Sequence, residues 1–334
     1  MGGAWDVTRI LLAVLAVLST IPMAAAQTPS QTAPQPWPAR TVKIVVPYPP
    51  GGNVDGAARI IAEHLQKALG QSFVIENKAG AGGLVGAESV VKAEADGYTL
   101  LLGANGPILF APETSSRRAY EWRRDFAPIT AVSLTPLVLQ VHPGVAAKSL
   151  KEFWDLARQQ PGQLRMASPG IGTTNHLLSE LMQARLGLSW VTVQYRGNAP
   201  ATNDLIGGHV QFNLDQVSVA QPFILDGKTR ALAVTRPARV AGLPEVPTFA
   251  ELGHAEFDAQ TFTGLMAPAA TPPAIVERAH AAVVKVLAEP ELKTRFNALG
   301  AEAAPMSIAD FRAYLEKEDA TWVPLIRKLG IKSE

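Results

Sequence analysis

The alternation of two sequence patterns constrains the fold of this chain more than any other feature. From about residue 40, short runs rich in Val, Ile and Leu alternate with segments whose apolar residues recur at helical spacing. Strands and helices joined by short connections predict an α/β fold, with parallel-dominated sheets flanked by helices. The predicted strands are residues 42–47, 72–76, 98–102, 164–167, 191–195, 211–214 and 231–234. The predicted helices are residues 55–69, 83–92, 150–159, 174–186, 199–206, 273–288 and 308–329.

Two longer apolar runs, residues 129–141 and 259–268, interrupt this alternation and show no helical spacing. Two long strands that pass between lobes have this pattern, so we predict a two-lobed fold with these crossing strands as its hinge. The expected domains are a discontinuous lobe 1 of residues 40–135 and 262–334, and a lobe 2 of residues 136–261. In open α/β sheets, ligands bind beyond the carboxyl ends of the strands, so the cleft between the lobes is the expected site.

The first residues have the parts of a secretory signal peptide. Arg9 precedes an apolar run over residues 10–18, and three alanines ending at Ala26 form a small-residue cleavage site. The apolar run is too short to span a membrane. We therefore expect residues 1–26 to be a signal peptide cleaved after Ala26, and residues 27–39 to be a Pro-rich flexible leader. The chain has no Cys for a disulfide or a lipid anchor, and we expect the mature protein in the periplasm.

The charge distribution argues against nucleic acid as a partner. The formal net charge is +1, and the basic residues cluster only at Arg117-Arg118 and Arg123-Arg124. A nucleic-acid-binding domain would carry a basic patch or stripe that attracts phosphates. We therefore expect the mature chain to bind no nucleic acid.

Nucleotide-binding motifs are not complete in the glycine-rich loops. The stretch GAGGLVG starts like the dinucleotide motif G-x-G-x-x-G at Gly80 and Gly82, but Val85 occupies the third glycine position. The phosphate-binding motif G-x-x-x-x-G-K-[ST] does not occur either. The sequence therefore predicts no nucleotide cofactor.

Catalytic and metal-binding patterns are also incomplete. Ser168, His176 and Asp215 could in principle form a hydrolytic triad, but Ser168 lies in ASPGIG and not in the G-x-S-x-G elbow. His176 and Glu180 share a helix face, yet no second His follows as in H-E-x-x-H. We expect His176 to line the cleft or to support the loop before it. We expect no enzyme activity, no cofactor and no metal.

Four predicted strands end in loops that suit an anion. They read YPPGGNVD, NKAGAGGLVG, SPGIGTTNH and RGNAP, and each is followed by a predicted helix. Glycines let main-chain amides approach a ligand, hydroxyl groups add donors, and helix N-termini carry partial positive charge. Any one of these loops could be a simple structural turn. Together they predict an anion-binding cleft.

Several polar residues in these loops have two possible roles. Asn53 or Asp55 could cap the helix after the first loop, and Asn198 could cap the helix after the fourth. Asp215 closes the strand QFNLD, where it could bind a ligand amine or a water, or cap the next helix. The sequence leaves these roles open.

The loop sequences are similar to those of one receptor family. The stretches VPYPPGGNVDGAARIIAEHL, VIENKAGAGGLVGAESV, ADGYTLLLG, DFAPIT, SPGIGTTNHL, YRGNAPATNDLIGGHV and LPEVPTFAELG occur in this order between Arg40 and Gly330. In this combination they resemble the Bug family, the periplasmic substrate-binding proteins of tripartite tricarboxylate transporters. The resemblance implies a two-lobed, type II Venus-flytrap receptor that captures a small carboxylate.

The resemblance also implies which residues bind the ligand. In the family, main-chain amides and ordered waters hold one carboxylate between the loop of the first strand and a Ser/Thr loop of the second lobe. Carried over by position, the expected ligand-binding residues are Tyr48, Pro50, Gly51, Gly52, Asp55, Ala81, Gly82, Ser168, Gly172, Thr173, Thr174, His176, Tyr195 and Asp215.

The sequence departs from the family pattern at two places. Gln194 stands where the family usually has a Pro before Tyr195. The segment GPILFAPETSSRRAYEW, residues 106–122, also differs from the usual one. Both are expected to shape the distal end of the pocket.

The expected function is that of a monomeric extracytoplasmic receptor. It would capture a mono-, di- or tricarboxylate, aliphatic or aromatic, and deliver it to the permease subunits of a tripartite transporter. The alternative is a ligand-binding sensor subunit that presents its closed form to a sensor kinase of a two-component system.

Overall fold

The structure is a computed structural model and describes residues 37–333. The predicted signal peptide and most of the predicted leader lie outside the described residues. Trp37, which falls in the predicted leader, is buried, and its indole N–H donates to the carbonyl oxygen of Gly97 at 3.1 Å. None of the helices within residues 37–333 is both long and apolar enough to cross a membrane.

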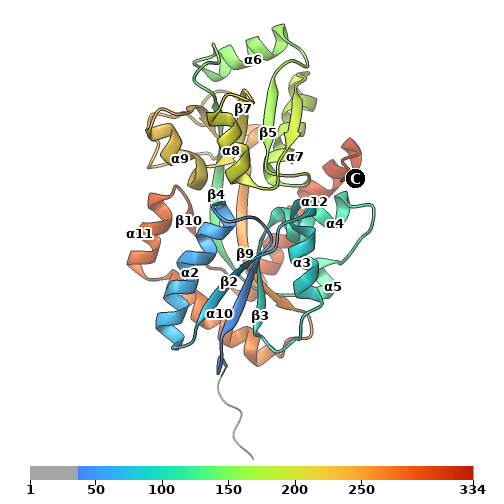
Figure 1. The fold of residues 1–334 in the computed structure, drawn as a ribbon, viewed down its shortest axis with the longest axis vertical. Coiled ribbons are helices and arrows are strands. Elements are labelled where there is room, and N and C mark those ends of the chain that lie inside the picture. The colour runs from blue at the N-terminus through green and yellow to red at the C-terminus, as the bar shows by residue number, and fades with distance from the viewer. Residues whose placement is uncertain (1–36, 334) are drawn as a thin grey trace, which may run out of the picture. The chain divides into compact units, whose positions relative to one another are not determined.

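The strands form one curled sheet in the order β2-β1-β3-β9-β4-β7-β5-β6, and β8 and β10 also pair with β4 (Figure 1). The strands are β1 (Val42–Val46), β2 (Phe73–Asn77), β3 (Thr99–Ala104), β4 (Phe126–Val141), β5 (Arg165–Ser168), β6 (Val191–Gln194), β7 (Phe212–Gln216), β8 (Arg230–Val234), β9 (Gln260–Pro268) and β10 (Glu302–Ala303). The helices are α2 (Asn53–Leu69), α3 (Leu84–Val91), α4 (Ala111–Thr114), α5 (Trp122–Asp125), α6 (Leu150–Gln159), α7 (Thr174–Leu186), α8 (Asn198–Ile206), α9 (Val217–Leu225), α10 (Pro273–Leu287), α11 (Pro290–Ala298) and α12 (Ile308–Leu329). Three short helical turns complete the structure: η1 (Ala81–Gly83), η2 (Gly106–Phe110) and η3 (Ala255–Phe257).

The predicted α/β fold with two crossing strands is confirmed. Strand β1 pairs parallel with β2 and β3, and β5 pairs parallel with β6 and β7. Strands β4 and β9 pair antiparallel with each other and pass between these two groups (Figure 1). The crossing strands thus add antiparallel pairs to two parallel groups, which makes the whole sheet mixed.

One long strand belongs to both groups. Residues 126–136 of β4 pair with β9, whereas residues 137–141 pair with β7 and β8. We call β1, β2, β3, β9 and residues 126–136 of β4 the first half of the sheet. The second half comprises β5 to β8 and residues 137–141 of β4. The change of partners within one strand connects the two halves without a loop.

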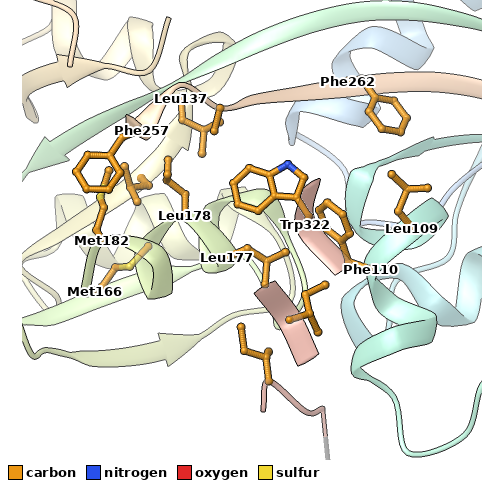
Figure 2. Close-up of a cluster of buried hydrophobic side chains, with 14 of the residues drawn as sticks. Leu109, Phe110, Leu137, Met166, Leu177, Leu178, Met182, Phe257, Phe262 and Trp322 are labelled. Carbon is orange, nitrogen blue, oxygen red and sulfur yellow. The ribbon is translucent and has the colours of Figure 1, made fainter. Parts of the chain in front are cut away.

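Apolar packing continues from one half to the other (Figure 2). Trp322 of α12 lies between Leu177 and Leu178 of α7 on one side and Phe110 of η2 on the other. The ring centroids of Phe110 and Trp322 are 6.2 Å apart, and all four side chains are buried. Burying an aliphatic or aromatic side chain of this size contributes roughly 1.5–3 kcal/mol. Helix α12 therefore holds the two halves together with apolar contacts.

Several elements were not predicted from the sequence. Helix α9 is almost uniformly apolar and contains Pro222, so it shows no helical alternation of apolar and polar residues. Helix α11 is short and starts at Pro290, directly after α10. The turns and short helices over residues 106–125 were also missed, because their contacts to α12 come from far along the chain.

Candidate functional site

A small polar cavity lies where the carboxyl ends of β1, β3, β5 and β7 meet the crossing strand β9. We call it the inner cavity, and its volume is about 20 Å³. This is room for roughly one or two water molecules. Its lining residues are Tyr48, Asn53, Val54, Ala104, Gly106, Pro169, Thr173, Thr174, Asn175, Asn198, Gln216 and Thr261. The lining contains no charged side chain.

Three helices begin at the inner cavity. Asn53 is the first residue of α2, Thr174 that of α7 and Asn198 that of α8, and all three line the cavity. The first amides of a helix have no intrahelical acceptor, and the helix dipole adds partial positive charge there. The converging N-termini make this cavity favourable for an anion.

Two buried donors in the lining have no partner within residues 37–333. They are the side-chain Nδ2 of Asn53 and the hydroxyl of Thr174, in residues that are 6% and 2% exposed. The Oδ1 of Asn53 accepts hydrogen bonds from Thr135 at 3.1 Å and Ser218 at 2.7 Å, which fixes the side-chain amide. Burial of an unpaired donor costs about 1–3 kcal/mol, so both groups favour a ligand that accepts hydrogen bonds.

A buried polar network holds the opposite wall of the cavity. Gln216 Nε2 donates to Asn175 Oδ1 at 2.9 Å and to Thr261 Oγ1 at 2.8 Å, and its Oε1 accepts from Asn198 Nδ2 at 2.6 Å. The network links α7, α8, β7 and the crossing strand β9. Because each of these amides is held by the others, the side chains at the cavity are fixed in orientation.

Asp215 supports this network and does not line the cavity. Its carboxylate accepts hydrogen bonds from Asn198 at 2.5 Å, Thr202 at 2.7 Å and the main-chain amide of Gln216 at 2.9 Å. Burial raises the pKa of Asp215 to about 6, and these hydrogen bonds act in the opposite direction. The prediction that Asn198 caps α8 is wrong, because Gly197 is the N-cap and the side chain of Asn198 bonds Asp215 and Gln216 instead.

Asp55 stabilises the first glycine-rich loop by a hydrogen bond to its main chain. This carboxylate accepts from the amide of Gly51 at 3.0 Å, from Arg59 at 2.9 Å and from Asn77 at 3.0 Å. Burial raises the pKa of Asp55, but the hydrogen bonds from Arg59, Gly51 and Asn77 outweigh it and hold the pKa below its usual range. Neither Asn53 nor Asp55 caps α2 as predicted, since the N-cap is Gly52 and no side chain caps it.

The loop between β5 and α7 is held by its own side chains. Thr173 caps α7: its hydroxyl accepts from the amide of His176 at 3.3 Å and donates to the carbonyl of Gly170 at 2.8 Å. The amide of Gly172 donates to Nδ1 of His176 at 3.4 Å, and burial lowers the pKa of His176 to about 4. His176 is therefore neutral near pH 7. The Ser168 hydroxyl donates to the carbonyl of Gly170 at 3.3 Å, within the same loop.

The backbones of the two halves approach closely around the cavity. A Cβ atom on Gly82 would lie 2.4 Å from the carbonyl oxygen of Ile171, and one on Gly106 would lie 3.1 Å from that of Gly172. Real Cβ contacts are almost never shorter than 3.0 Å. Only glycine at position 82 therefore permits this closed arrangement.

A second hollow, the outer pocket, adjoins the inner cavity. It has a volume of about 410 Å³, and Tyr48 and Pro169 line both spaces. The rest of its lining is Ala79, Gly80, Ala81, Gly82, Gly83, Gly170, Ile171, Gln194, Tyr195, Arg196, Lys332 and Ser333. Burial of the Tyr48 phenol, at the boundary of the two spaces, raises its pKa above the usual range.

The structure distributes the expected ligand-binding residues over several places. Tyr48, Thr173 and Thr174 line the inner cavity. Ala81, Gly82 and Tyr195 line the outer pocket. Gly51, Gly52 and Asp55 line a third hollow of about 300 Å³, which Asn53 also lines. Pro50, Ser168, Gly172, His176 and Asp215 line neither the inner cavity nor the outer pocket.

Sequence reasoning missed several residues of the inner cavity as ligand contacts. Asn53, Asn175 and Gln216 are each adjacent in sequence to a residue that was chosen, and Asn198 was considered only as a helix cap. A systematic reading of every polar side chain at these positions would have found them. Thr261 lies inside a long apolar run and gave no signal.

The fold and the site together define a solute-binding protein. A polar cavity lies between two groups of parallel strands that are joined by crossing strands. Residues 57–331 match the family described as the tripartite tricarboxylate transporter family receptor, to which this chain belongs.

Known relatives agree with this assignment. The chain is 34% identical over 328 residues to protein BugT of Bordetella pertussis strain Tohama I, and the match covers 98% of this chain and 99% of BugT. A solved structure of an R. palustris protein with adipate superposes with a TM-score of 0.86 at 33% identity, over 89% of this chain and 99% of that one. MatC from Rhodopseudomonas palustris with bound malate gives a TM-score of 0.82 at 32% identity, over 86% and 99%.

Proposed function

We propose that this protein is an extracytoplasmic receptor that captures a small carboxylate in the inner cavity and delivers it to the permease of a tripartite transporter. The observation that carries the proposal is the set of free donors in the cavity: three helix N-termini, the Nδ2 of Asn53 and the hydroxyl of Thr174. The adipate and malate in the solved structures of family members support a carboxylate as the ligand.

The cavity suits a carboxylate headgroup without a matching cation. Its lining offers amide and hydroxyl donors and includes no acidic side chain. Hydrogen bonds to a charged acceptor contribute roughly 1.5–3 kcal/mol each. Since no Lys or Arg takes part, binding of the headgroup depends only modestly on ionic strength.

Ligand entry requires the two halves to separate. The inner cavity holds no more than roughly one or two waters, and the loops of the two halves lie close together at Gly82 and Ile171. We infer that the halves open about the crossing strands β4 and β9, which carry the connection between them. The domain limits for this motion are residues 40–135 with 262–334, and 136–261.

The same proposal assigns the mature chain to the periplasm. Its support is the periplasmic receptor family and the sequence of residues 1–26, with cleavage proposed after Ala26. N-terminal sequencing of exported protein tests the cleavage, and an intact Met1 in mature material contradicts it.

Calorimetric titration with a panel of carboxylates tests the ligand class. We expect binding in wild type and none in Asn53→Asp, because the aspartate keeps the acceptor for Thr135 and Ser218 but replaces the donor by a negative charge. The exposed Asn297→Asp variant is the matched control and keeps wild-type affinity. If a folded Asn53→Asp protein binds the carboxylate with wild-type affinity, the inner cavity is not the binding site.

Delivery to a permease needs a separate test. Uptake of the bound carboxylate by vesicles that contain the permease subunits is expected to require this protein and to fail with Asn53→Asp. Equal uptake with and without the receptor would contradict the transport role and leave the binding role intact.

A further inference from the structure

A buried carboxyl group adjoins the wall of the inner cavity. Asp215 of β7 is 1% exposed. Its Oδ1 accepts hydrogen bonds from Nδ2 of Asn198 at 2.5 Å and from the main-chain amide of Gln216 at 2.9 Å. Asn198 and Gln216 both line the inner cavity. A single layer of residues therefore separates this carboxyl group from the space proposed to hold a ligand carboxylate.

The carboxylate of Asp215 has no cationic partner. No ion pair within residues 37–333 includes it. Its Oδ2 accepts hydrogen bonds from two neutral side chains, the Thr202 hydroxyl at 2.7 Å and Nδ2 of Asn213 at 3.4 Å. Burial without a neighbouring cation raises the pKa of Asp215 to about 6. Its charge is therefore sensitive to any further anion that comes close.

Charged groups on the elements packed against β7 do not compensate Asp215. Strand β4 and helix α9 contain no titratable side chain. Helix α8 contains Asp204, which accepts from the Tyr195 hydroxyl at 2.6 Å instead. The titratable residues of β5 and α7 are Arg165, His176, Glu180 and Arg185. None of them forms a hydrogen bond or an ion pair with Asp215 within the described residues.

The hydrogen bonds around Asp215 also suit its protonated form. A hydroxyl group accepts as well as donates, so a proton on Oδ2 can be donated to Oγ1 of Thr202. The Thr202 hydroxyl can then turn to a carbonyl oxygen of the preceding turn of α8. Oδ1 still accepts from Asn198 and from the amide of Gln216. Protonation therefore removes the charge and leaves the wall of the inner cavity in place.

We infer that capture of a carboxylate anion in the inner cavity is coupled to the uptake of a proton from solvent at Oδ2 of Asp215. The inference rests on the proposed binding of a carboxylate in that cavity. Two like charges repel strongly in a buried site, so the ligand favours the neutral form of Asp215. By linkage, the neutral form in turn binds the ligand more tightly, and affinity rises as the pH falls.

Calorimetric titration measures the proton directly. Adipate and malate are titrated into wild type near pH 7 in buffers with different enthalpies of ionisation, and the dependence of the binding enthalpy on the buffer gives the number of protons taken up. We expect uptake of a fraction of a proton, up to one. Between about pH 6.5 and pH 8.5, where these acids are already ionised, affinity should fall by about three- to tenfold.

The variant Asp215→Asn imitates the protonated carboxyl group. Its amide keeps an acceptor for Asn198 and Gln216 and a donor for Thr202. We expect it to take up no proton, to show no dependence on pH, and to bind at about pH 8.5 at least as tightly as wild type. A purely structural role of the Asp215 charge predicts the opposite, a loss of affinity at every pH. Melting curves confirm that the variant is folded.

Two further variants locate the proton. Burial also raises the pKa of Glu318 to about 7, and this carboxyl group accepts from Asn105, beside the inner cavity. Glu318→Gln should keep the proton uptake of wild type, and so should Asp226→Asn, which removes an exposed carboxylate of the second half. Uptake that is lost in Glu318→Gln and kept in Asp215→Asn overturns the inference.

The remaining outcomes separate this inference from the proposed function. Binding of adipate or malate by wild type without proton uptake, or with an affinity that rises with pH, overturns the coupling and leaves the carboxylate receptor standing. If folded wild type binds neither acid nor any other member of the carboxylate panel, the proposed function itself is contradicted.

Discussion

Neighbouring threonines at the start of α7 have different roles. The Thr173 hydroxyl is used twice within its loop, as the helix cap and as a donor to Gly170. The Thr174 hydroxyl is buried at the inner cavity and has no partner within the described residues. Two residues of one chemical type therefore differ in that one hydroxyl is used within the fold and the other is free for the proposed ligand.

Threonine-to-valine substitutions at these two positions should separate the two roles. Thr174→Val is expected to weaken carboxylate binding by about 1.5–3 kcal/mol, roughly ten- to a hundredfold, with little change in melting temperature. Thr173→Val loses the cap of α7 and should lower the free energy of unfolding by about 1 kcal/mol. Calorimetry with melting curves measures both, and an unchanged affinity in Thr174→Val would show that its hydroxyl does not contact the ligand.

A second residue-scale feature is the half-buried carboxyl group of Glu318 on α12. Its Oε2 accepts from Asn105 Nδ2 at 2.8 Å, and the Oδ1 of Asn105 accepts from the amide of Phe262 in β9 at 3.0 Å. Burial raises the pKa of Glu318 from 4.5 to about 7, while Asn105 and Lys317 act against this shift and the charge of Asp258 adds to it. The carboxyl group is thus partly protonated near neutral pH.

This raised pKa predicts how stability depends on pH. The folded protein binds more protons at Glu318 than the unfolded chain between about pH 4.5 and pH 7, so the free energy of unfolding falls as the pH rises through this window. The loss is on the order of 1–3 kcal/mol. Glu318→Gln keeps an acceptor for Asn105 and should flatten this part of the profile, whereas the exposed Glu316→Gln should not. Denaturant titrations across the pH range measure it, and identical slopes in all three proteins would contradict the prediction.

At the scale of elements, the site is built from the starts of helices and not from a cluster of charges. Helices α2, α7 and α8 each follow a strand, so the parallel order within each half brings their N-termini to the same cleft. The antiparallel crossing strands then place the two sets of N-termini opposite each other. Positions at which the facing loops touch have no room for a side chain.

Gly82 tests this contact, and Gly187 provides a matched control. Both residues have φ of 63°, so replacement by Ala adds a similar backbone strain of roughly 1–2 kcal/mol at either position. Only at Gly82 would the new Cβ meet a neighbour, the Ile171 carbonyl oxygen at 2.4 Å; around Gly187 nothing lies within 4 Å. We expect Gly82→Ala to lose carboxylate affinity by at least about tenfold because the halves cannot close. Equal affinities of the two variants by titration would argue against closure at this contact.

For the whole molecule, the closed arrangement is held by polar and apolar contacts together. The Ser218 hydroxyl of α9 donates a hydrogen bond to Oδ1 of Asn53 in α2. Trp322 of α12 packs against Leu177 of α7. Opening must break the first contact and rearrange the second. A ligand that contacts both halves binds the closed form more tightly than the open form. It shifts the equilibrium toward the closed form by the difference between these two binding free energies.

Small-angle scattering should detect this motion. Addition of a saturating carboxylate is expected to lower the radius of gyration of wild type, because the two halves close about β4 and β9. The Gly82→Ala protein should remain at the larger value at the same ligand concentration. No change in wild type with a ligand whose binding is confirmed would count against a hinged receptor.

The sequence by itself was sufficient for the class of fold and for the loops that surround the inner cavity. Helices α6, α7 and α12 were predicted with their observed limits, because each combines a polar cap residue with a regular apolar stripe. The crossing strands were visible as long apolar runs, and the glycine-rich loops marked the strand ends that surround the cavity. These features depend on residues that are close together in the chain, so they can be recognised from the sequence.

Only the tertiary structure decided which polar groups are free. Asn53 and Asp55 both lie in the first turn of α2, but the distant residues Thr135 and Ser218 bond the Oδ1 of Asn53 and leave its Nδ2 unpaired, whereas Asn77 bonds Asp55. Lys332 likewise lines the outer pocket because the C-terminal segment folds back and bonds Thr114. Hydrogen bonds between residues far apart in the chain follow from packing in three dimensions, and for that reason the sequence alone indicated the loops around the inner cavity but not which of their donors are free.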